Sequence, residues 1–407
     1  MADAKIHYHQ GPGDYPQPDF SAYQIRATGN DDPPFPPDPT QIKSILILKL
    51  DALGDYLLHT PFFSYLRKFY PHAKITLVCV QENLSLVETN PAFDTITPLP
   101  FPSGADQRMK MMFGMELQSH ASAPFDLIIV PRWSEDWHHA GVIAHSVGAP
   151  YRLSYSAQST PMKRQYAQQH DDYFTHVIDD TRPAHEVWRG MQLLHALGME
   201  MPPITDIRQE LHTTMDDTAI IDALFTGKNY PRPWIALGVG ASIAHKRWPG
   251  EKFAQLVAQL DNTYGGTVFI LGHGEEDAAA AAAILNKSNK SVNCVGNLSP
   301  RTSGTLIQQC DMMVTNDSFA LHAAATVGTP AVEVVGHPAD GNPDTEYLPW
   351  RFGPWGIPFA WVQPVTCGGS ACGMADYLNE VKCIGEVPVE SVLNAVKEIL
   401  RNGKNAS

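Results

Sequence analysis

The stretch ILILKLDALGD at residues 45–55 decides the fold class of this chain. Residues 45–48 are continuously apolar and partly β-branched, as expected of a parallel strand that is covered on both faces. Residues 56–69 then change to the spacing of an amphipathic helix. The pattern predicts an α/β fold and places Asp55 outside the carboxyl end of a strand, where open α/β sheets bind ligands. The alternative is that Asp51 or Asp55 merely caps the helix.

Composition limits the class of protein. A chain of 407 residues is too long for one ordinary core, so we expect two domains. The hydrophobic content of 43% and the charged content of 18% are typical of a soluble globular protein, and no apolar run is long enough to span a membrane. The amino terminus lacks the apolar centre of a secretory signal, which favours a cytoplasmic location. The net charge of -14 argues against nucleic acid as a partner.

We expect four segments along the chain. Residues 1–41 are rich in proline and lack a periodic pattern, which indicates an extended arm or a disordered leader. Residues 42–203 and 204–385 each alternate strands with helices, which predicts two Rossmann-like, doubly wound domains that face an interdomain cleft. Residues 386–407 contain a final amphipathic helix that we expect to pack back on the cleft region. The expected strands are 45–48, 75–80, 95–99 and 127–130, then 235–238, 268–271, 292–294, 312–315 and 331–335.

Glycines follow the first strand of the second expected domain. The sequence GVGAS at residues 238–242 lets a ligand approach the backbone, and Ser242 with its neighbouring amides suits phosphate oxygens. Lys246 supplies a charge suited to a diphosphate, although an ordinary solvated lysine is the alternative. A nicotinamide fingerprint fits poorly, because Ile243 follows and the third glycine is missing. A dehydrogenase is therefore disfavoured.

Two further strand ends carry polar residues. Asp317 and Ser318 start a helix of small residues, where amides and the helix dipole favour an anion, and His322 lies one turn further on. The alternative is a plain helix cap with a core histidine. The loop LGHGEE at residues 271–276 offers Glu275 and Glu276 as acceptors for sugar hydroxyls, or as the first turn of a helix.

Three cysteines gather near the end of the chain, at Cys367, Cys372 and Cys383. A structural iron or zinc site needs four ligands, so a fourth would have to come from elsewhere in the chain or from a partner. Reduced cysteines that pack in the core are the favoured alternative.

Four motifs together resemble glycosyltransferase family 9, the ADP-heptose heptosyltransferases. They are LKLDALGD at 48–55 with HTP at 59–61, KRWP at 246–249, LGHGEE at 271–276 and NDSFALH at 316–322. Their order and spacing match, and the resemblance covers about residues 42–400. It implies a GT-B fold, with the donor nucleotide in the C-terminal domain, the acceptor in the N-terminal domain, and no metal in the chemistry.

The resemblance also implies residue roles. Asp55 matches the proposed general base, Lys246 the lysine that contacts the donor diphosphate, and Asp317 the acid that touches the donor sugar. The other donor-binding positions are the amides of Ser318, Phe319 and Ala320 with His322 behind them, Glu275 or Glu276 near the ribose, and Leu298 on the adenine. We add Gly240 and Ser242 from the glycine loop, and Gly54, where a side chain would crowd the sugar. Phe319 departs from the family, which often has glycine there, and only three cysteines match a related iron-binding branch that glycosylates autotransporter proteins.

These roles predict an inverting transfer of heptose, or a related sugar, from an ADP-linked donor to a hydroxyl acceptor. The acceptor stays open between the lipopolysaccharide inner core, another glycan and a protein serine, with peripheral contact at the inner membrane surface as a further expectation. The alternatives are a non-catalytic nucleotide-sugar-binding module and a GT-B sugar epimerase.

Overall fold

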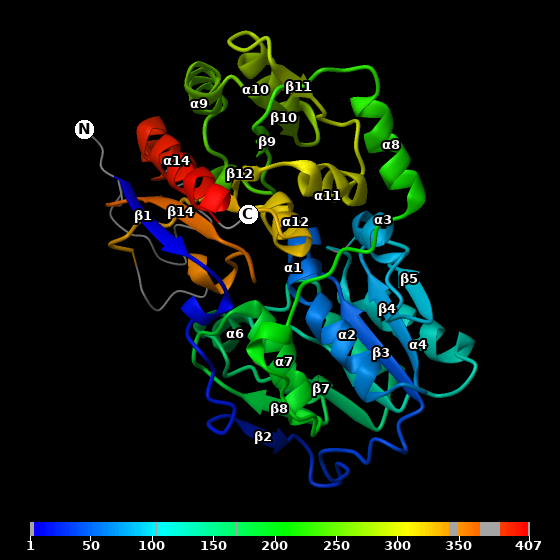
Figure 1. Ribbon diagram of the computed structural model, residues 1–407. Helices are drawn as coiled ribbons and strands as arrows, with labels where there is room; N and C mark the ends of the chain where they lie inside the picture. Colours follow the sequence, from blue (N-terminus) through cyan, green and yellow to red (C-terminus); the bar gives the residue numbers. More distant parts are fainter. Residues whose placement is uncertain (1–3, 103, 168, 342–347, 367–382, 406–407) are drawn as a thin grey trace. The chain divides into compact units, whose positions relative to one another are not determined.

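The computed structural model describes residues 4–102, 104–167, 169–341, 348–366 and 383–405. The chain forms two compact units (Figure 1). The N-terminal unit is Pro16–Ile207, and the C-terminal unit joins Met1–Tyr15 to Arg208–Ser407. The chain therefore passes between the units twice. In the described parts of the chain, no helix is long and apolar enough to cross a membrane.

The N-terminal unit is built on a seven-stranded sheet in the order β2-β8-β7-β6-β3-β4-β5. All neighbouring strands are parallel except β2 and β8. The central strand β3 is buried along its whole length, because helices cover both faces of the sheet, as its unbroken apolar run predicts. The strands are β2 (Gln24–Ala27), β3 (Ser44–Lys49), β4 (Lys74–Cys79), β5 (Thr95–Pro98), β6 (Leu127–Ile129), β7 (Tyr151–Tyr155) and β8 (His176–Asp179).

Helices follow most of these strands. They are α1 (Leu53–Leu58), α2 (Thr60–Phe69), α3 (Leu84–Val87), α4 (Gln107–His120), α5 (Ala140–Val147), α6 (Pro161–Tyr166) and α7 (Glu186–Ala196). The single helix expected over residues 56–69 is two helices that meet at His59. The reason is Pro61, which has no amide hydrogen to donate to the Leu57 carbonyl. The Thr60 hydroxyl donates to that carbonyl instead, at 2.7 Å.

The C-terminal unit is built on a second seven-stranded sheet, in the order β1-β14-β13-β12-β9-β10-β11. Only β1 is antiparallel to its neighbour. Its strands are β1 (Ala4–His9), β9 (Trp234–Gly238), β10 (Thr267–Leu271), β11 (Ser291–Asn293), β12 (Met312–Asn316), β13 (Ala331–Val334) and β14 (Phe359–Pro364). Its helices are α8 (Met215–Phe225), α9 (Gly250–Tyr264), α10 (Glu275–Leu285), α11 (Pro300–Gln309), α12 (Phe319–Val327) and α14 (Val389–Asn405).

The final helix, α14, belongs to the core of the C-terminal unit. Its apolar side chains, among them Val392 and Val396, join one buried cluster with residues of α9, α10 and the sheet. The strong apolar stripe of α14 accounts for this position, because burial against a sheet removes most of that stripe from water. The packing of this helix on a cleft region, which we expected from the sequence, stays a prediction.

The proline-rich segment at residues 1–41 contains two strands, which differs from the arm or leader that its composition indicates. β1 pairs with β14 in the C-terminal unit, and β2 pairs with β8 in the N-terminal unit. Each strand covers one edge of a sheet and pairs with backbone N–H and C=O groups that would otherwise lack hydrogen-bond partners within the sheet. In β1 the apolar Ala4 and Ile6 pack on the core, while His7 and His9 stack on Trp361.

Candidate functional site

Asp55 lies in the first turn of α1, just beyond the carboxyl end of β3, and is half-buried. The residue before the helix is Ala52, and no side chain caps this helix. Within the described residues, no hydrogen bond or ion pair reaches the Asp55 carboxylate. The capping alternative is therefore wrong for Asp55. Gly54 lies in the same turn.

Asp51 has two cationic partners and is not a helix cap either. Its carboxylate accepts from Lys49 Nζ and from Arg132 Nη1, each at 2.7 Å. Burial on its own would raise the pKa of Asp51, but the charges of Arg132 and Lys49 outweigh burial and hold that pKa well below its usual range. We call Lys49, Asp51 and Arg132 the acid-base cluster of the N-terminal unit. Arg132, which follows β6, had no assigned role in the sequence pattern.

His59 ties the end of α1 back to its start. Its Nδ1–H donates to the Asp55 carbonyl oxygen at 3.0 Å, so its Nε2 carries the lone pair. Burial, followed by the positive charge of Lys49, lowers the pKa of His59 to about 3. The ring is therefore neutral near pH 7 and adds no charge beside Asp55.

Lys246 and Asp317 form an ion pair in the C-terminal unit. Lys246 ends the short 3-10 helix Ala244–Lys246, and its Nζ lies 2.5 Å from the Asp317 carboxylate beyond β12. Burial raises the pKa of Asp317, but the charge of Lys246 outweighs burial and lowers it overall. The two side chains are 26% and 23% exposed, so the pair is accessible from solvent.

Asn316, the last residue of β12, links the glycine loop at residues 238–242 to the KRWP segment at residues 246–249. Its side-chain amide donates to the carbonyls of Val239 and Gly240, at 3.0 and 3.2 Å. Its side-chain oxygen accepts from the backbone N–H of Trp248 at 3.1 Å. The side chain is fully buried. In the sequence, Asn316 was only the first residue of the NDSFALH motif, and this role was missed.

Asp277 explains two of the glycines. A Cβ at Gly240 would lie 2.4 Å from the Asp277 carboxylate, and one at Gly272 would lie 2.6 Å from it. That carboxylate pairs with Arg247 and accepts from the His273 N–H at 2.7 Å. Gly240 thus makes room for a buried acid, which is a different reason from the ligand approach that the sequence pattern suggested.

Helix α12 begins without a side-chain cap. The Ser318 hydroxyl shares a hydrogen bond with Thr315 Oγ1 at 3.1 Å instead of capping the first turn. The capping alternative is therefore wrong for Ser318, and the amides at the start of α12 suit an anion. Phe319 and Ala320 are half-buried there, whereas His322 is buried.

The other candidate residues lie on neighbouring loops of the same sheet. Glu275 and Glu276 open α10, and Glu276 pairs with Arg247 Nε at 3.1 Å. The loop after β11 carries the half-buried Leu298. Ser242 is exposed. All of these residues follow the carboxyl ends of parallel strands, where α/β sheets hold ligands.

The cysteine prediction falls mostly outside the described residues. Cys367 and Cys372 lie there, and Cys383 is described and buried. Among residues that the structure describes, no group of three or more His, Cys, Asp and Glu side chains is arranged to hold a metal ion.

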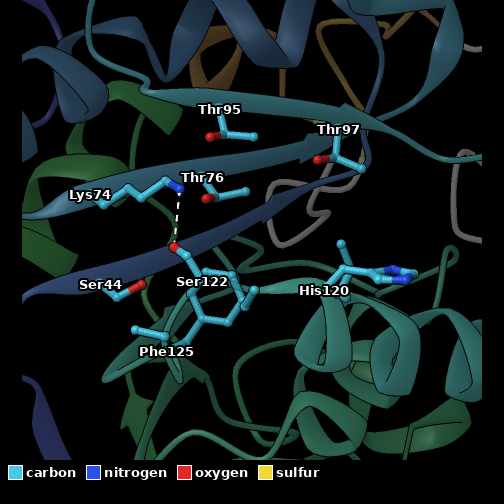
Figure 2. A pocket seen from close by; sticks show the side chains of 11 residues that line it. Ser44, Lys74, Thr76, Thr95, Thr97, His120, Ser122 and Phe125 are labelled. Carbon is cyan, nitrogen blue, oxygen red and sulfur yellow. Dashed lines mark hydrogen bonds between the residues drawn. The ribbon is translucent and has the colours of Figure 1, made fainter.

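A cavity of about 200 Å³ in the N-terminal unit lies away from these residues (Figure 2). Ser44, Lys74 and Thr95 are at the amino ends of β3, β4 and β5 and line it, together with Phe125 and part of α4. Asp55 follows the opposite end of β3. The cavity therefore contributes nothing to the candidate site.

The chain matches the protein-family model of glycosyltransferase family 9 (heptosyltransferase) over residues 125–342. It belongs to this family. Lipopolysaccharide heptosyltransferase 3 of Escherichia coli is 24% identical over 318 residues, which cover 74% of this chain and 83% of that relative. The family 9 glycosyl transferase of Veillonella parvula aligns in structure with a TM-score of 0.68 and 20% identity, over 88% of this chain and 98% of that one. Escherichia coli heptosyltransferase WaaC with ADP aligns with a TM-score of 0.61 and 14% identity, over 88% and 99%.

These comparisons confirm the fold class and the enzyme class. The two sheets of this family 9 glycosyltransferase are the two Rossmann-like halves of a GT-B fold. The enzyme class is that of the heptosyltransferases, which are glycosyltransferases.

Proposed function

We propose that this family 9 enzyme transfers heptose, or a related sugar, from an ADP-linked donor to a hydroxyl acceptor with inversion at the anomeric carbon. The observation that carries the proposal is the half-buried Asp55 carboxylate, which follows a central strand and forms no hydrogen bond or ion pair among the described residues. Two similar proteins support the proposed donor and the proposed class of acceptor. WaaC was solved with ADP, and the sequence relative is named a lipopolysaccharide heptosyltransferase.

Asp55 is the proposed general base. It would accept the proton of the acceptor hydroxyl while the hydroxyl oxygen attacks the anomeric carbon and the bond to the diphosphate breaks on the opposite face. An aspartate is basic enough for this step only because the O–H bond is already weakened in the transition state. Asp51 is neutralised by Lys49 and Arg132, which leaves Asp55 as the carboxylate available for the proton.

The proposed donor site lies at the carboxyl ends of β9, β10, β11 and β12. Lys246 would exchange Asp317 for the diphosphate, and the uncapped amides of α12 would hold its oxygens and stabilise the charge that builds up on the departing ADP. Asp317 would then face the sugar hydroxyls. Glu275 or Glu276 would bind the ribose, and Leu298 would pack on the adenine. This scheme needs no metal ion for chemistry.

The proposed acceptor is a glycan of the lipopolysaccharide inner core, because the relative at 24% identity carries that name. Another glycan or a protein serine would satisfy the same chemistry. A lipid-linked acceptor would place the enzyme at the cytoplasmic surface of the inner membrane. A structural metal at the cysteines remains a separate proposal that the chemistry does not use.

The test measures ADP release from ADP-heptose with and without a lipopolysaccharide-core acceptor. We expect Asp55→Asn to lower acceptor-dependent release at least about 100-fold, the usual range for a lost acid-base group, while ADP affinity stays within about twofold. Glu82→Gln is the matched control, because Glu82 is an exposed acid that follows β4 at the same sheet edge. Turnover by Asp55→Asn would refute the base assignment. ADP release at the same rate with and without the acceptor would favour the epimerase. Binding of ADP-heptose without ADP release would favour the non-catalytic module.

A further inference from the structure

Glu333 is an acid inside an apolar strand, in the sequence AVEVV at residues 331–335. On β13 its register partners are Thr315 of β12 and Trp361 of β14, so these side chains share one face of the sheet. Its side chain is 2% exposed. Within the described residues its Oε2 has no hydrogen-bond partner. A buried polar atom without a partner is costly, which points to a function rather than to packing.

The end of β13 supports both loops of the proposed donor site. Thr315, next to Glu333, shares a hydrogen bond with Ser318 at the start of α12. Gly336, just beyond the strand, packs so closely on the Lys246 loop that a Cβ there would lie 2.9 Å from the His245 carbonyl oxygen. Glu333 is therefore on the strand against which the Lys246–Asp317 pair is held.

The charge of Glu333 depends on this pair. Burial, and then the negative charge of Asp317, raise the pKa of Glu333 well above its usual range, and the opposing effect of Lys246 is smaller. The surroundings therefore favour the neutral carboxylic acid form of Glu333 over its carboxylate. The titratable groups around it are Asp317 and Lys246, whose charges act on Glu333, Tyr15 from the N-terminal segment, and His245 and His322, which act on Asp317. His7 and His9 of β1 lie on the same face of the sheet, where they stack on Trp361.

We propose that Glu333 is a positioning residue that sets the charge of the donor site and makes donor binding sensitive to pH. A neutral Glu333 leaves Lys246 able to exchange Asp317 for the donor diphosphate. An ionised Glu333 places a second carboxylate beside Lys246, which competes for the ammonium group and repels the diphosphate. The inference rests on the proposed role of Lys246 at the diphosphate.

The test is calorimetric titration of the full-length protein with ADP between pH 6.5 and pH 9. For the natural chain we expect ADP affinity to weaken by about tenfold across this range, as one added charge close to a diphosphate would cause. Glu333→Gln keeps a neutral polar side chain, so it should match the natural chain at pH 6.5 within about twofold and lack this loss at higher pH. The ionisation of ADP and of the surrounding groups affects both proteins alike.

Two further variants separate charge from structure. Leucine in Glu333→Leu is also neutral, so this variant should likewise lack the loss of ADP affinity at higher pH. Asp311→Asn removes an acid that precedes β12 and pairs with Arg232 at the amino edge of the same sheet, and it should keep the natural profile. Parallel profiles for the natural chain and Glu333→Gln would overturn the proposal, as would a tenfold weaker affinity of the folded Glu333→Gln at pH 6.5. Absence of ADP binding by every protein would instead refute the donor assignment, and the role of Glu333 with it.

Discussion

Replacing Asp51 by Asn tests the acid-base cluster next to the proposed base. The Lys49 side chain is 1% exposed, and Asp51 is its counter-ion at 2.7 Å. Asparagine nearly keeps the shape of the side chain and removes its charge. The variant therefore leaves the Lys49 ammonium buried without a carboxylate, while Arg132, whose side chain is 24% exposed, gains water in place of its partner.

The expected cost is large because only one half of the buried pair is removed. Breaking a buried ion pair costs about 3–5 kcal/mol, whereas an exposed pair contributes about 0–1 kcal/mol, so most of the loss belongs to Lys49. We expect Asp51→Asn to lower the free energy of unfolding by about 3 kcal/mol. Adding Lys49→Met removes the stranded cation and should recover about 2 kcal/mol, since apolar replacement of a whole buried pair is often neutral or better.

The pH dependence follows from the lowered pKa of Asp51 in the folded state. The stabilisation is present above the unfolded pKa of about 4 and is lost as pH falls below it. The free-energy gap between the natural chain and Asp51→Asn should therefore shrink in acid. Native-state hydrogen exchange of β3 amides is the assay, because the two units need not unfold together. A loss below about 1 kcal/mol, or a double variant less stable than the single one, would refute the reasoning.

Two other predictions concern single residues. Gly240→Ala should destabilise the C-terminal unit by about 1–3 kcal/mol, because the new Cβ would lie 2.4 Å from the Asp277 carboxylate. Adding Asp277→Ala to the same chain should recover part of that loss, as measured by urea denaturation. His59 has its pKa lowered from 6.5 to about 3, so its unfolded form binds a proton that the folded form rejects. Stability of the N-terminal unit should fall as pH drops below 6.5, by up to about 1.4 kcal/mol per pH unit from this group, and His59→Gln should show a correspondingly shallower acid dependence of unfolding.

Local pattern was enough to predict β3 to β6, β9 to β13 and the last helices. The apolar run at residues 45–48 lies inside β3, and the helix of small residues that we expected to start at Asp317 and Ser318 is α12, which begins at Phe319. Each of these two segments is covered by apolar neighbours on both faces, so the apolar residues of its sequence match its burial. The edge strands β1 and β2 were missed because their residues are mixed and their pairing partners lie far away in the chain. Three interior strands, β7, β8 and β14, were not predicted either.

In the candidate site, too, contacts between residues that are distant in the sequence could not be predicted. Loop residues such as Lys246 and Asp317 follow strand ends, a signal that a single sequence contains. The partnership of Asp51 with Arg132, 81 residues away, leaves no local pattern, nor does the bond from Asn316 to the Gly240 loop. Glu333 did leave a signal, an acid within an apolar strand, and a search for buried charges in strands would have found it.

Solvent exposure decides which of the two ion pairs can take part in a reaction cycle. Lys246 and Asp317 are each about one quarter exposed, so water compensates either group when the pair opens, and the exchange of Asp317 for a diphosphate costs little. Lys49 is buried and has no such compensation, so its pair with Asp51 stays closed at neutral pH. The first pair is therefore suited to ligand exchange and the second to holding a fixed charge. In the proposed mechanism, Asp51 would stay bound to Lys49 and Arg132 and would leave Asp55 as the carboxylate available for a proton, while the exchangeable pair at the donor loop would give Lys246 to the diphosphate only when the donor is present.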